Sequence, residues 1–423
     1  MKKVLMILYQ FPPCNDVGAF RSVKFIKYLS DFNWHPVVLA PLNAEYASYD
    51  FEKEDSIRHL CTIYRCPLLN PFGLIHGIGS KNTGGLYQLI WRIWNRAAIP
   101  DGAILWFVSA FARSLAIIRK EKINIIFVSG QPFSVFVIAA MVKKITGLPL
   151  VLDYRDPWTM NPFHKGLPGA ISLERKMEQK ILRLADAAVF TTRAAADLHI
   201  SAFSDYIDMH QIHTITNSYE PVRNKYLSRN SGHKFLIVHA GNLYGNRDPK
   251  SLFKGIALAA GKNSVFERSV QVEFYGIVDY SKYRKSLERL GIHHLIKFRG
   301  RIPYDRLMRK LQKADVQILI NSHGKGHEIF IPAKFFDYLK IGRPVLCLTR
   351  NGALKDIMKA TKAGHCVDPE DAEKICSLLL KMFNAGGAAN ANDNKKTRKI
   401  REQYESLNTT RKLTRIFDRV ISQ

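Results

Sequence analysis

Short apolar segments recur along the first half of the chain, and helical patterns, such as the one over 17–29, lie between several of them. Continuous apolar strands that alternate with helices predict a parallel sheet with helices on both faces. The expected strands of this half occupy 3–9, 35–40, 123–129, 148–153, 187–192 and 212–217.

The second half of the chain repeats this scheme. Its expected strands occupy 235–241, 270–276, 296–300, 315–321 and 344–349. Proline is favourable in the first turn of a helix. We therefore expect helices to begin near Pro249, Ser281, Pro303, Pro332, Gly352 and Pro369. The pattern predicts an α/β protein with two Rossmann-like, doubly wound parallel-sheet domains that face each other across a cleft.

A polar segment at 218–232 separates the two halves, and 423 residues suit two domains of ordinary size. We predict domains at 1–220 and 221–394, followed by a basic helical segment at 395–423 that could pack back on the N-terminal domain. Ligands of doubly wound sheets bind outside the carboxyl ends of the strands. Two facing sheets would therefore place two binding edges on one cleft.

The chain is strongly basic, with 63 Lys and Arg residues against 36 Asp and Glu residues and a net charge of +27. This excess suits an anionic partner, which could be a phosphate-rich substrate, an acidic membrane leaflet or nucleic acid. General solubility of a basic protein is the alternative. No recognisable nucleic-acid module occurs. The six cysteines form no CxxC pair, so we expect neither a zinc site nor a disulfide framework, and a cytoplasmic location.

Two apolar stretches need separate interpretation. The first, 4–9, follows two lysines but is short and has no small-residue cleavage site after it, so we interpret it as a buried strand rather than a signal peptide. The second, 123–142, lacks charges over a membrane-spanning length. Its central Ser, Gly, Gln and Pro residues favour a strand, a loop and a helix instead.

The run HEIFIPAKFFDYLKIGRPVL at 327–346 is the most informative. A loop with Glu328 leads into a helix on which Lys334 and Asp337 share one face. An acid there can accept hydrogen bonds from ribose hydroxyls, and a lysine in the first turn adds positive charge where phosphate is already favoured. The alternative is an ordinary amphipathic helix with solvated side chains.

A second run, HAGNLYGNRDPKSLFKGI at 239–256, joins a strand to a helix through a turn rich in Gly and Asn. Gly241 lets the backbone approach a ligand closely, and Arg247 can bind phosphate through two N–H groups. The alternative is a simple turn with an exposed arginine.

Two further runs follow strands of the first half. Gly18 opens the first helix, where a diphosphate could approach backbone N–H groups, although no GxGxxG motif is present. Arg155 and Asp156 lie at the carboxyl end of another strand and would point toward the cleft. They could instead pair with each other and hold their loop.

Four stretches in the expected order resemble family 4 glycosyltransferases of the GT-B fold, most of all the bacterial branch that assembles capsule, exopolysaccharide or O-antigen. They are FPPCNDVGAFRSVKFIKYL, DYRDPWT, HAGNLYGNRDPKSL and IPAKFFDYLKIGRPVL. The resemblance implies a nucleotide-sugar donor bound by the C-terminal domain, an acceptor on the side of the N-terminal domain, and usually retention of anomeric configuration.

The resemblance also implies residue roles. The second donor-binding acid of the family falls on Asp337, and the first falls on Ile329, one residue after Glu328. Arg247, with Lys334 as a helper, represents the cations that neutralise the diphosphate, while Asn242 replaces the usual arginine. The predicted donor-binding residues are Gly18, Gly241, Asn242, Arg247, Glu328, Lys334 and Asp337. The predicted catalytic residues are Arg247, Lys334 and Asp156, and the acceptor-side residues are Arg155, Ser129 and Gln131.

No D-x-D motif occurs in the chain, so we expect no metal and no cofactor; the nucleotide sugar is a substrate. The segment 86–97 is basic, aromatic and amphipathic, and 395–419 carries excess positive charge. Both suggest peripheral association with an anionic membrane and a lipid-linked glycan acceptor. A core-facing surface helix is the alternative for 86–97.

An epimerase and a non-enzymatic basic protein are the alternative functions. A GT-B sugar-nucleotide epimerase would convert the donor without an acceptor, and a basic protein that binds nucleic acid or membrane would have no activity. The segment 255–263 has the wrong glycine spacing for a P-loop ATPase and lacks the Ser or Thr after the lysine. The glycine fingerprint of a dinucleotide-dependent dehydrogenase is also missing.

Overall fold

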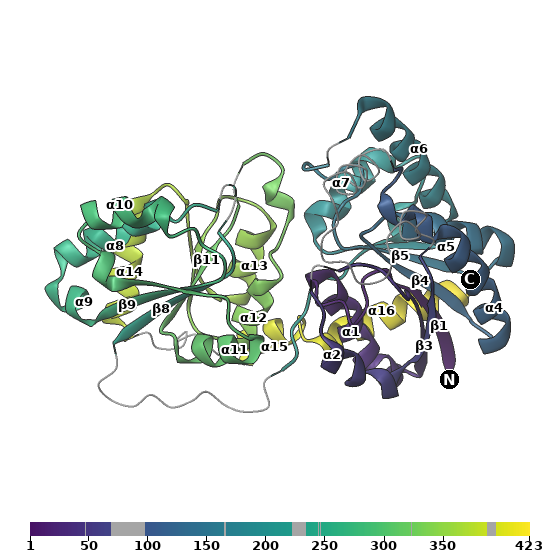
Figure 1. Ribbon diagram of the computed structural model, residues 1–423, viewed down its shortest axis with the longest axis horizontal. Coiled ribbons are helices and arrows are strands. Elements are labelled where there is room, and N and C mark those ends of the chain that lie inside the picture. The colour runs from purple at the N-terminus through teal and green to yellow at the C-terminus, as the bar shows by residue number, and fades with distance from the viewer. Residues whose placement is uncertain are drawn as a thin grey trace, which may run out of the picture. The chain divides into compact units, whose positions relative to one another are not determined.

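The protein consists of two compact units in the computed structural model (Figure 1). Unit 1 contains Met1–Asn217 and Ser406–Gln423, and unit 2 contains Ser218–Glu405, so the chain passes between the units twice. The structure describes residues 1–46, 48–68, 98–164, 166–221, 234–243, 245, 247–322, 324–386 and 395–423.

Unit 1 is built on a seven-stranded sheet with the order β3-β2-β1-β4-β5-β6-β7. All six pairings of neighbouring strands are parallel. The central strands β4, β5 and β6 are buried along their whole length, as expected when helices cover both faces. Their bounds are β1 Lys2–Ile7, β2 Trp34–Pro41, β3 Thr62–Cys66, β4 Ile125–Gly130, β5 Leu150–Tyr154, β6 Ala187–Phe190 and β7 Ile212–Thr214.

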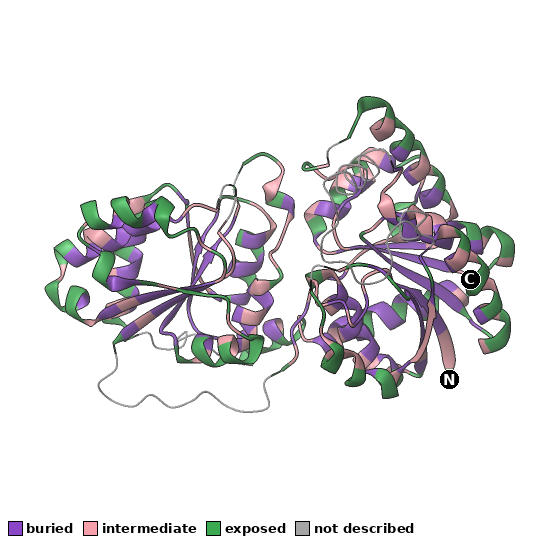
Figure 2. Ribbon diagram, viewed as in Figure 1, coloured by how far each residue is buried: buried purple, intermediate pink, exposed green. Residues whose placement is uncertain are grey.

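Helices cover both faces of this sheet, so the strands form the buried layer between them (Figure 2). One core contains Trp106, Phe136 and Phe190, and the other contains Trp34, Phe127 and Phe417. The helices are α1 Val17–Leu29, α2 Phe51–Asp55, α4 Phe107–Glu121, α5 Ser134–Thr146, α6 Pro168–Leu184, α7 Arg193–Phe203 and, from the end of the chain, α16 Ser406–Ile421.

Unit 2 has a six-stranded parallel sheet with the order β10-β9-β8-β11-β12-β13. The order reverses at β8 and β11, which creates the switch point where such sheets bind ligands. The strands are β8 Phe235–Ala240, β9 Val270–Tyr275, β10 Ile296–Gly300, β11 Val316–Ile320, β12 Val345–Leu348 and β13 Gly364–Val367.

The helices of unit 2 also form two layers, with separate apolar clusters on the two faces of the sheet. They are α8 Lys250–Lys262, α9 Ser264–Ser269, α10 Ser281–Arg289, α11 Tyr304–Lys313, α12 Lys334–Ile341, α13 Ala353–Thr361, α14 Ala372–Asn384 and α15 Lys395–Glu402. Proline precedes the helices that begin at Lys250 and Tyr304, as the sequence pattern predicts.

The predicted α/β class with two parallel sheets is confirmed. The charge-free stretch 123–142 forms β4 and α5 with a turn between them, as expected. The basic segment at 395–423 differs from the expected single helix, because α15 belongs to unit 2 and α16 to unit 1. Among the described residues, one helical stretch, Gly102–Glu121, is long and apolar enough to cross a membrane by length and composition.

Candidate functional site

The turn after β8 brings Gly241 against the start of α12. Gly241 has a φ of 142°, and a methyl group at this position would come within 2.5 Å of the Lys334 Nζ atom. Glycine therefore gives the amine room to lie over the backbone at the carboxyl end of β8. The two elements predicted to build one site are in contact.

Lys334 and Arg247 form the charged centre of this edge. The Lys334 Nζ atom is buried and has no hydrogen-bond partner among the described residues. Burial, together with the positive charge of Arg247, lowers the pKa of Lys334 to about 7. The Arg247 Nε atom donates a hydrogen bond to Ser322 Oγ at 3.0 Å. An anion placed here would gain two cations and satisfy a buried amine.

Two amides at the start of α12 are hydrogen-bonded within the helix start itself. The N–H groups of Phe335 and Phe336 donate to the carbonyl oxygens of Pro332 and Ala333 at 2.9 and 3.1 Å. These two amides are therefore already bonded within the first turn. The anion-binding role expected of this helix start stays a prediction.

Asn242 has a structural role in the described part of the turn. Its side-chain oxygen accepts a hydrogen bond from the N–H of Ile277 at 2.8 Å, and the N–H of Gly241 donates to the carbonyl of Tyr275 at 2.7 Å. These bonds tie the turn after β8 to the loop after β9. Lys334, which comes from α12, lies against this turn at Gly241.

Asp337 does not accompany Lys334 into this centre. Its carboxylate accepts a hydrogen bond of 2.8 Å from the hydroxyl of Tyr304, the first residue of α11. The shared helix face predicted from the spacing therefore splits between two neighbours, because one side chain reaches β8 and the other reaches α11. Tyr304 was not among the predicted site residues, because a tyrosine at the start of a helix does not by itself indicate a binding site.

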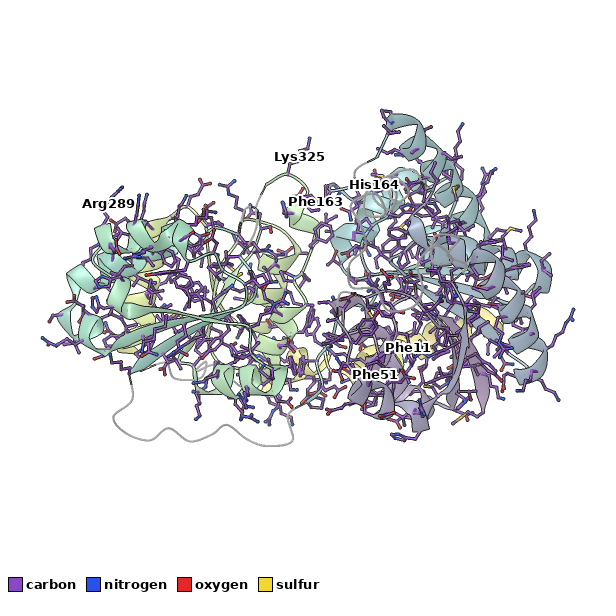
Figure 3. All side chains as sticks on the ribbon, in the orientation of Figure 1. Phe11, Phe51, Phe163, His164, Arg289 and Lys325 are labelled. Carbon is purple, nitrogen blue, oxygen red and sulfur yellow. The ribbon has the colours of Figure 1, made fainter. Side chains whose placement is uncertain are left out.

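Glu328 lies in a short helical turn between β11 and α12 and is exposed. It lines a cavity of about 390 Å³, which also includes Ser322, the hydrogen-bond partner of Arg247. Lys325 projects from the tip of the same loop (Figure 3). The described residues that line it are Asn321, Ser322, Gly324, Lys325, His327, Glu328, Thr349, Arg350 and Asn351.

In unit 1, Arg155 lies against two other predicted residues, Gln131 and Gly18. Its guanidinium donates to the carbonyl oxygens of Gly130 and Gln131, the second at 2.5 Å. A methyl group at position 18 would collide with the Arg155 guanidinium. Glycine at position 18 therefore makes room for the Arg155 side chain. The sequence had predicted that a diphosphate would lie here.

Ser129 belongs to a buried network rather than to an open surface. Its hydroxyl donates to Asp153 Oδ2 at 2.8 Å, and Arg21 pairs with the same carboxylate at 2.9 Å. Arg21 also donates to the carbonyl oxygens of Ile215 and Thr216. Both Arg21 and Asp153 were missed, although DYRD and GAFR lie in the quoted motifs, because 132 positions separate them.

The alternative of an Arg155–Asp156 pair is not supported, since no ion pair joins the two in the described structure. Burial raises the pKa of Asp156, and the positive charge of Arg155 acts in the opposite direction. Their loop is held by α6 instead. Trp158 donates to Glu174 at 2.8 Å, and the Thr159 N–H donates to Glu178 at 3.2 Å.

The described residues contain no group of three or more His, Cys, Asp or Glu side chains that could hold a metal ion. Metal independence stays a prediction. The segment 86–97, predicted to contact membrane, lies outside the described residues.

Comparisons with known proteins show the fold. No protein-family model matches the chain, and no curated protein matches it in sequence. A glycosyltransferase from Rickettsia africae aligns with a TM-score of 0.63 at 13% identity over 100% of this chain and 99% of that chain. Anabaena Alr3699/HepE in complex with UDP aligns with a TM-score of 0.62 at 15% identity over 99% and 100%.

The lipopolysaccharide outer core galactosyltransferase WaaB gives a TM-score of 0.61 at 12% identity over 99% of both chains. These similarities extend over both parallel-sheet units. The chain therefore has the GT-B fold of two Rossmann-like α/β domains.

Proposed function

We propose that the protein is a nucleotide-sugar-dependent glycosyltransferase that holds the donor diphosphate with Lys334 and Arg247. One observation carries the proposal: the buried amine of Lys334, beside Arg247, has no hydrogen-bond partner among the described residues. A buried ammonium without a partner is costly, so the site favours an anion. The UDP bound to HepE, a structural neighbour, supports a nucleoside diphosphate as that anion.

The chemistry follows from charge. Cleavage of the sugar–phosphate bond leaves negative charge on the departing diphosphate. Cations fixed by the fold stabilise that charge without rearranging during the reaction. Lys334 and Arg247 would supply this stabilisation, while Asp337 would accept hydrogen bonds from ribose and Glu328 would face the sugar in the neighbouring cavity.

The finer assignments rest on the sequence resemblance. They are membership of family 4, a hexose as the transferred group, retention of configuration, and a lipid-linked glycan acceptor in bacterial polysaccharide assembly at the cytoplasmic membrane face. Arg155, Gln131 and Asp156, at the carboxyl edge of unit 1, would contact the acceptor; Asp156 is the candidate for catalysis there.

A titration calorimetry series with UDP, GDP, UDP-sugars, GDP-sugars, ATP and NAD tests the donor site. We expect a nucleoside diphosphate or its sugar to bind, with loss of binding in Lys334→Met and Arg247→Ala. Lys340→Met is the matched control, since Lys340 lies on the same helix, in its last turn. Equal affinity of the wild type and both site variants would refute the proposal.

Product analysis then separates the two enzymatic possibilities. A transferase moves the sugar only when an acceptor is present, or hydrolyses the donor slowly, whereas an epimerase returns an isomeric nucleotide sugar without an acceptor. Turnover in Arg247→Ala should fall by about 10²–10³-fold if this cation stabilises the leaving group. Activity should survive EDTA; loss restored by Mg²⁺ or Mn²⁺ would contradict metal independence.

A further inference from the structure

Helix α6 separates its charges by sign. Its two carboxylates, Glu174 and Glu178, are 4% and 0% exposed. Its Arg and Lys side chains are all exposed. They are Arg175, Lys176, Lys180 and Arg183.

The acids face inward because they hold the loop that follows β5. Glu174 accepts a hydrogen bond from Trp158 and pairs with His164 Nε2 at 3.0 Å. Glu178 accepts from the N–H of Thr159. The carboxylates are thereby removed from the outer surface of the helix, so no acid of α6 offsets its exposed cations.

The outer face of α6 also carries leucine. Leu173, Lys176, Lys180 and Arg183 follow the i, i+3, i+7, i+10 spacing of one helical stripe, roughly opposite Glu174 and Glu178. Leu173 is 47% exposed, and Leu167, which caps the start of the helix, is 72% exposed. Apolar side chains thus stand at one end of a basic stripe.

We propose that this face, defined by Leu167, Leu173, Lys176, Lys180 and Arg183, docks on an anionic membrane surface. Lysine and arginine are attracted to acidic lipid headgroups, and leucine gains free energy when it enters the acyl boundary. The phosphates of nucleic acid would attract the cations, but they would offer the leucine side chains no apolar environment. The combination therefore favours a bilayer. The inference is independent of the donor chemistry, since it concerns binding alone.

The test is cosedimentation of the full-length protein with vesicles of phosphatidylcholine containing about 30 mol% phosphatidylglycerol, at about 50 mM and about 500 mM NaCl. We expect binding at low salt that weakens at high salt. The triple variant K176Q/K180Q/R183Q should lower the partition coefficient by roughly fivefold per charge, on the order of 100-fold in total. The variant L167S/L173S should weaken binding at both salt concentrations.

Helix α10 of unit 2 offers the matched control. Lys282, Lys285 and Arg289 are exposed and have nearly the same spacing, and Figure 3 shows Arg289 at the surface. The variant K282Q/K285Q/R289Q removes the same charge, so it should retain most of the vesicle binding. UDP binding measured on each variant reports separately on the donor site.

Two outcomes would overturn the proposal. If the α6 and α10 triple variants lose vesicle binding equally, the attraction comes from net charge and not from this face. If L167S/L173S binds vesicles as the wild type does, and a single-stranded DNA oligonucleotide is bound more tightly than the vesicles, the face is a nucleic-acid surface. Unchanged circular dichroism spectra would show that the variants are folded.

Discussion

The protonation state of Lys334 is set by its surroundings. Burial and the neighbouring Arg247 both favour the neutral amine, which brings its pKa from 10.5 to about 7. A bound diphosphate would reverse this balance, because two negative charges nearby favour the ammonium form. Ligand binding and proton uptake should therefore be linked at this residue.

This linkage predicts pH-dependent donor affinity. Above about pH 7 the free protein carries neutral Lys334, so diphosphate binding must take up a proton and should weaken as pH rises, by up to about tenfold per pH unit. Calorimetry with UDP in two buffers of different ionisation enthalpy would measure the proton uptake. Lys334→Met should remove that component; an unchanged proton uptake in this variant would assign it to another group.

The same residue predicts a stability change in the free protein. The folded pKa lies below the unfolded value, so the folded state binds fewer protons between the two, and stability falls as pH decreases through this window. The cost is complete below about pH 7. Since a tenfold change in protonation corresponds to about 1.4 kcal/mol, Lys334→Met should raise the free energy of unfolding by a few kcal/mol at about pH 6 and by little near pH 10. Urea unfolding at both pH values checks this, and a pH-independent difference would contradict it.

Single site residues could be predicted from the sequence where they follow the carboxyl end of a predicted strand or open the next helix. Gly241, Arg247 and Lys334 follow from the rule that ligands bind at carboxyl strand ends, and the structure brings them together. Partners contributed by distant elements were not predictable. Tyr304 meets Asp337 across 33 positions, and no local pattern encodes such a contact.

At the scale of elements, buried polar contacts fix how α1 and α6 sit on the sheet of unit 1. Arg21 of α1 pairs with Asp153 at the end of β5, with exposures of 5% and 0%. Glu174 and Glu178 of α6 hold the loop after the same strand. The strand end that bears Arg155 is therefore braced from two helices.

Asp153→Asn should destabilise unit 1 by about 3–5 kcal/mol, because it leaves the Arg21 guanidinium buried without its counter-charge. Chemical denaturation of the full-length protein measures the loss. Asp197→Asn is the control, since Asp197 forms an exposed pair with Arg193, with side chains 53% and 74% exposed, and should change stability far less. An equal loss of stability in the two variants would show that the buried pair contributes no more to stability than the exposed pair.

The elements that the sequence did not reveal are the edge strands β3 and β13. Thr62–Cys66 mixes polar and apolar residues and is mostly half-buried, and Gly364–Val367 has four residues including a glycine. Central strands are buried on both faces and therefore read as continuous apolar runs. An edge strand need not be apolar on both faces, and in β3 and β13 this freedom leaves short sequences that resemble loops.

At the scale of the whole molecule, α16 connects the end of the chain to the core of unit 1. Phe417 is fully buried, with ring centroids 5.2 Å from Trp34 and 5.8 Å from Phe127. The sequence predicted a basic helical segment but not its division. The division follows from an apolar stripe, Leu413, Ile416, Phe417 and Val420, that only α16 carries.

Phe417→Ala should destabilise unit 1 by about 3–5 kcal/mol, because it removes a buried ring from a packed aromatic cluster. Differential scanning calorimetry would show a lowered transition, while the UDP binding proposed for unit 2 should persist. Phe51→Ala provides the comparison, since that ring is 67% exposed. Loss of UDP binding in Phe417→Ala would mean that the units do not fold independently.

Because the chain crosses twice between the units, the last segment of unit 1 is synthesised after all of unit 2. Ser218–Glu405 are synthesised before Ser406–Gln423, so every segment of unit 2 is present in the growing chain while unit 1 still lacks its last helix. Until α16 is synthesised, Phe417 cannot pack on Trp34 and Phe127. A chain truncated before Ser406 should therefore contain a complete unit 2, while its unit 1 exposes an apolar surface that chaperones bind.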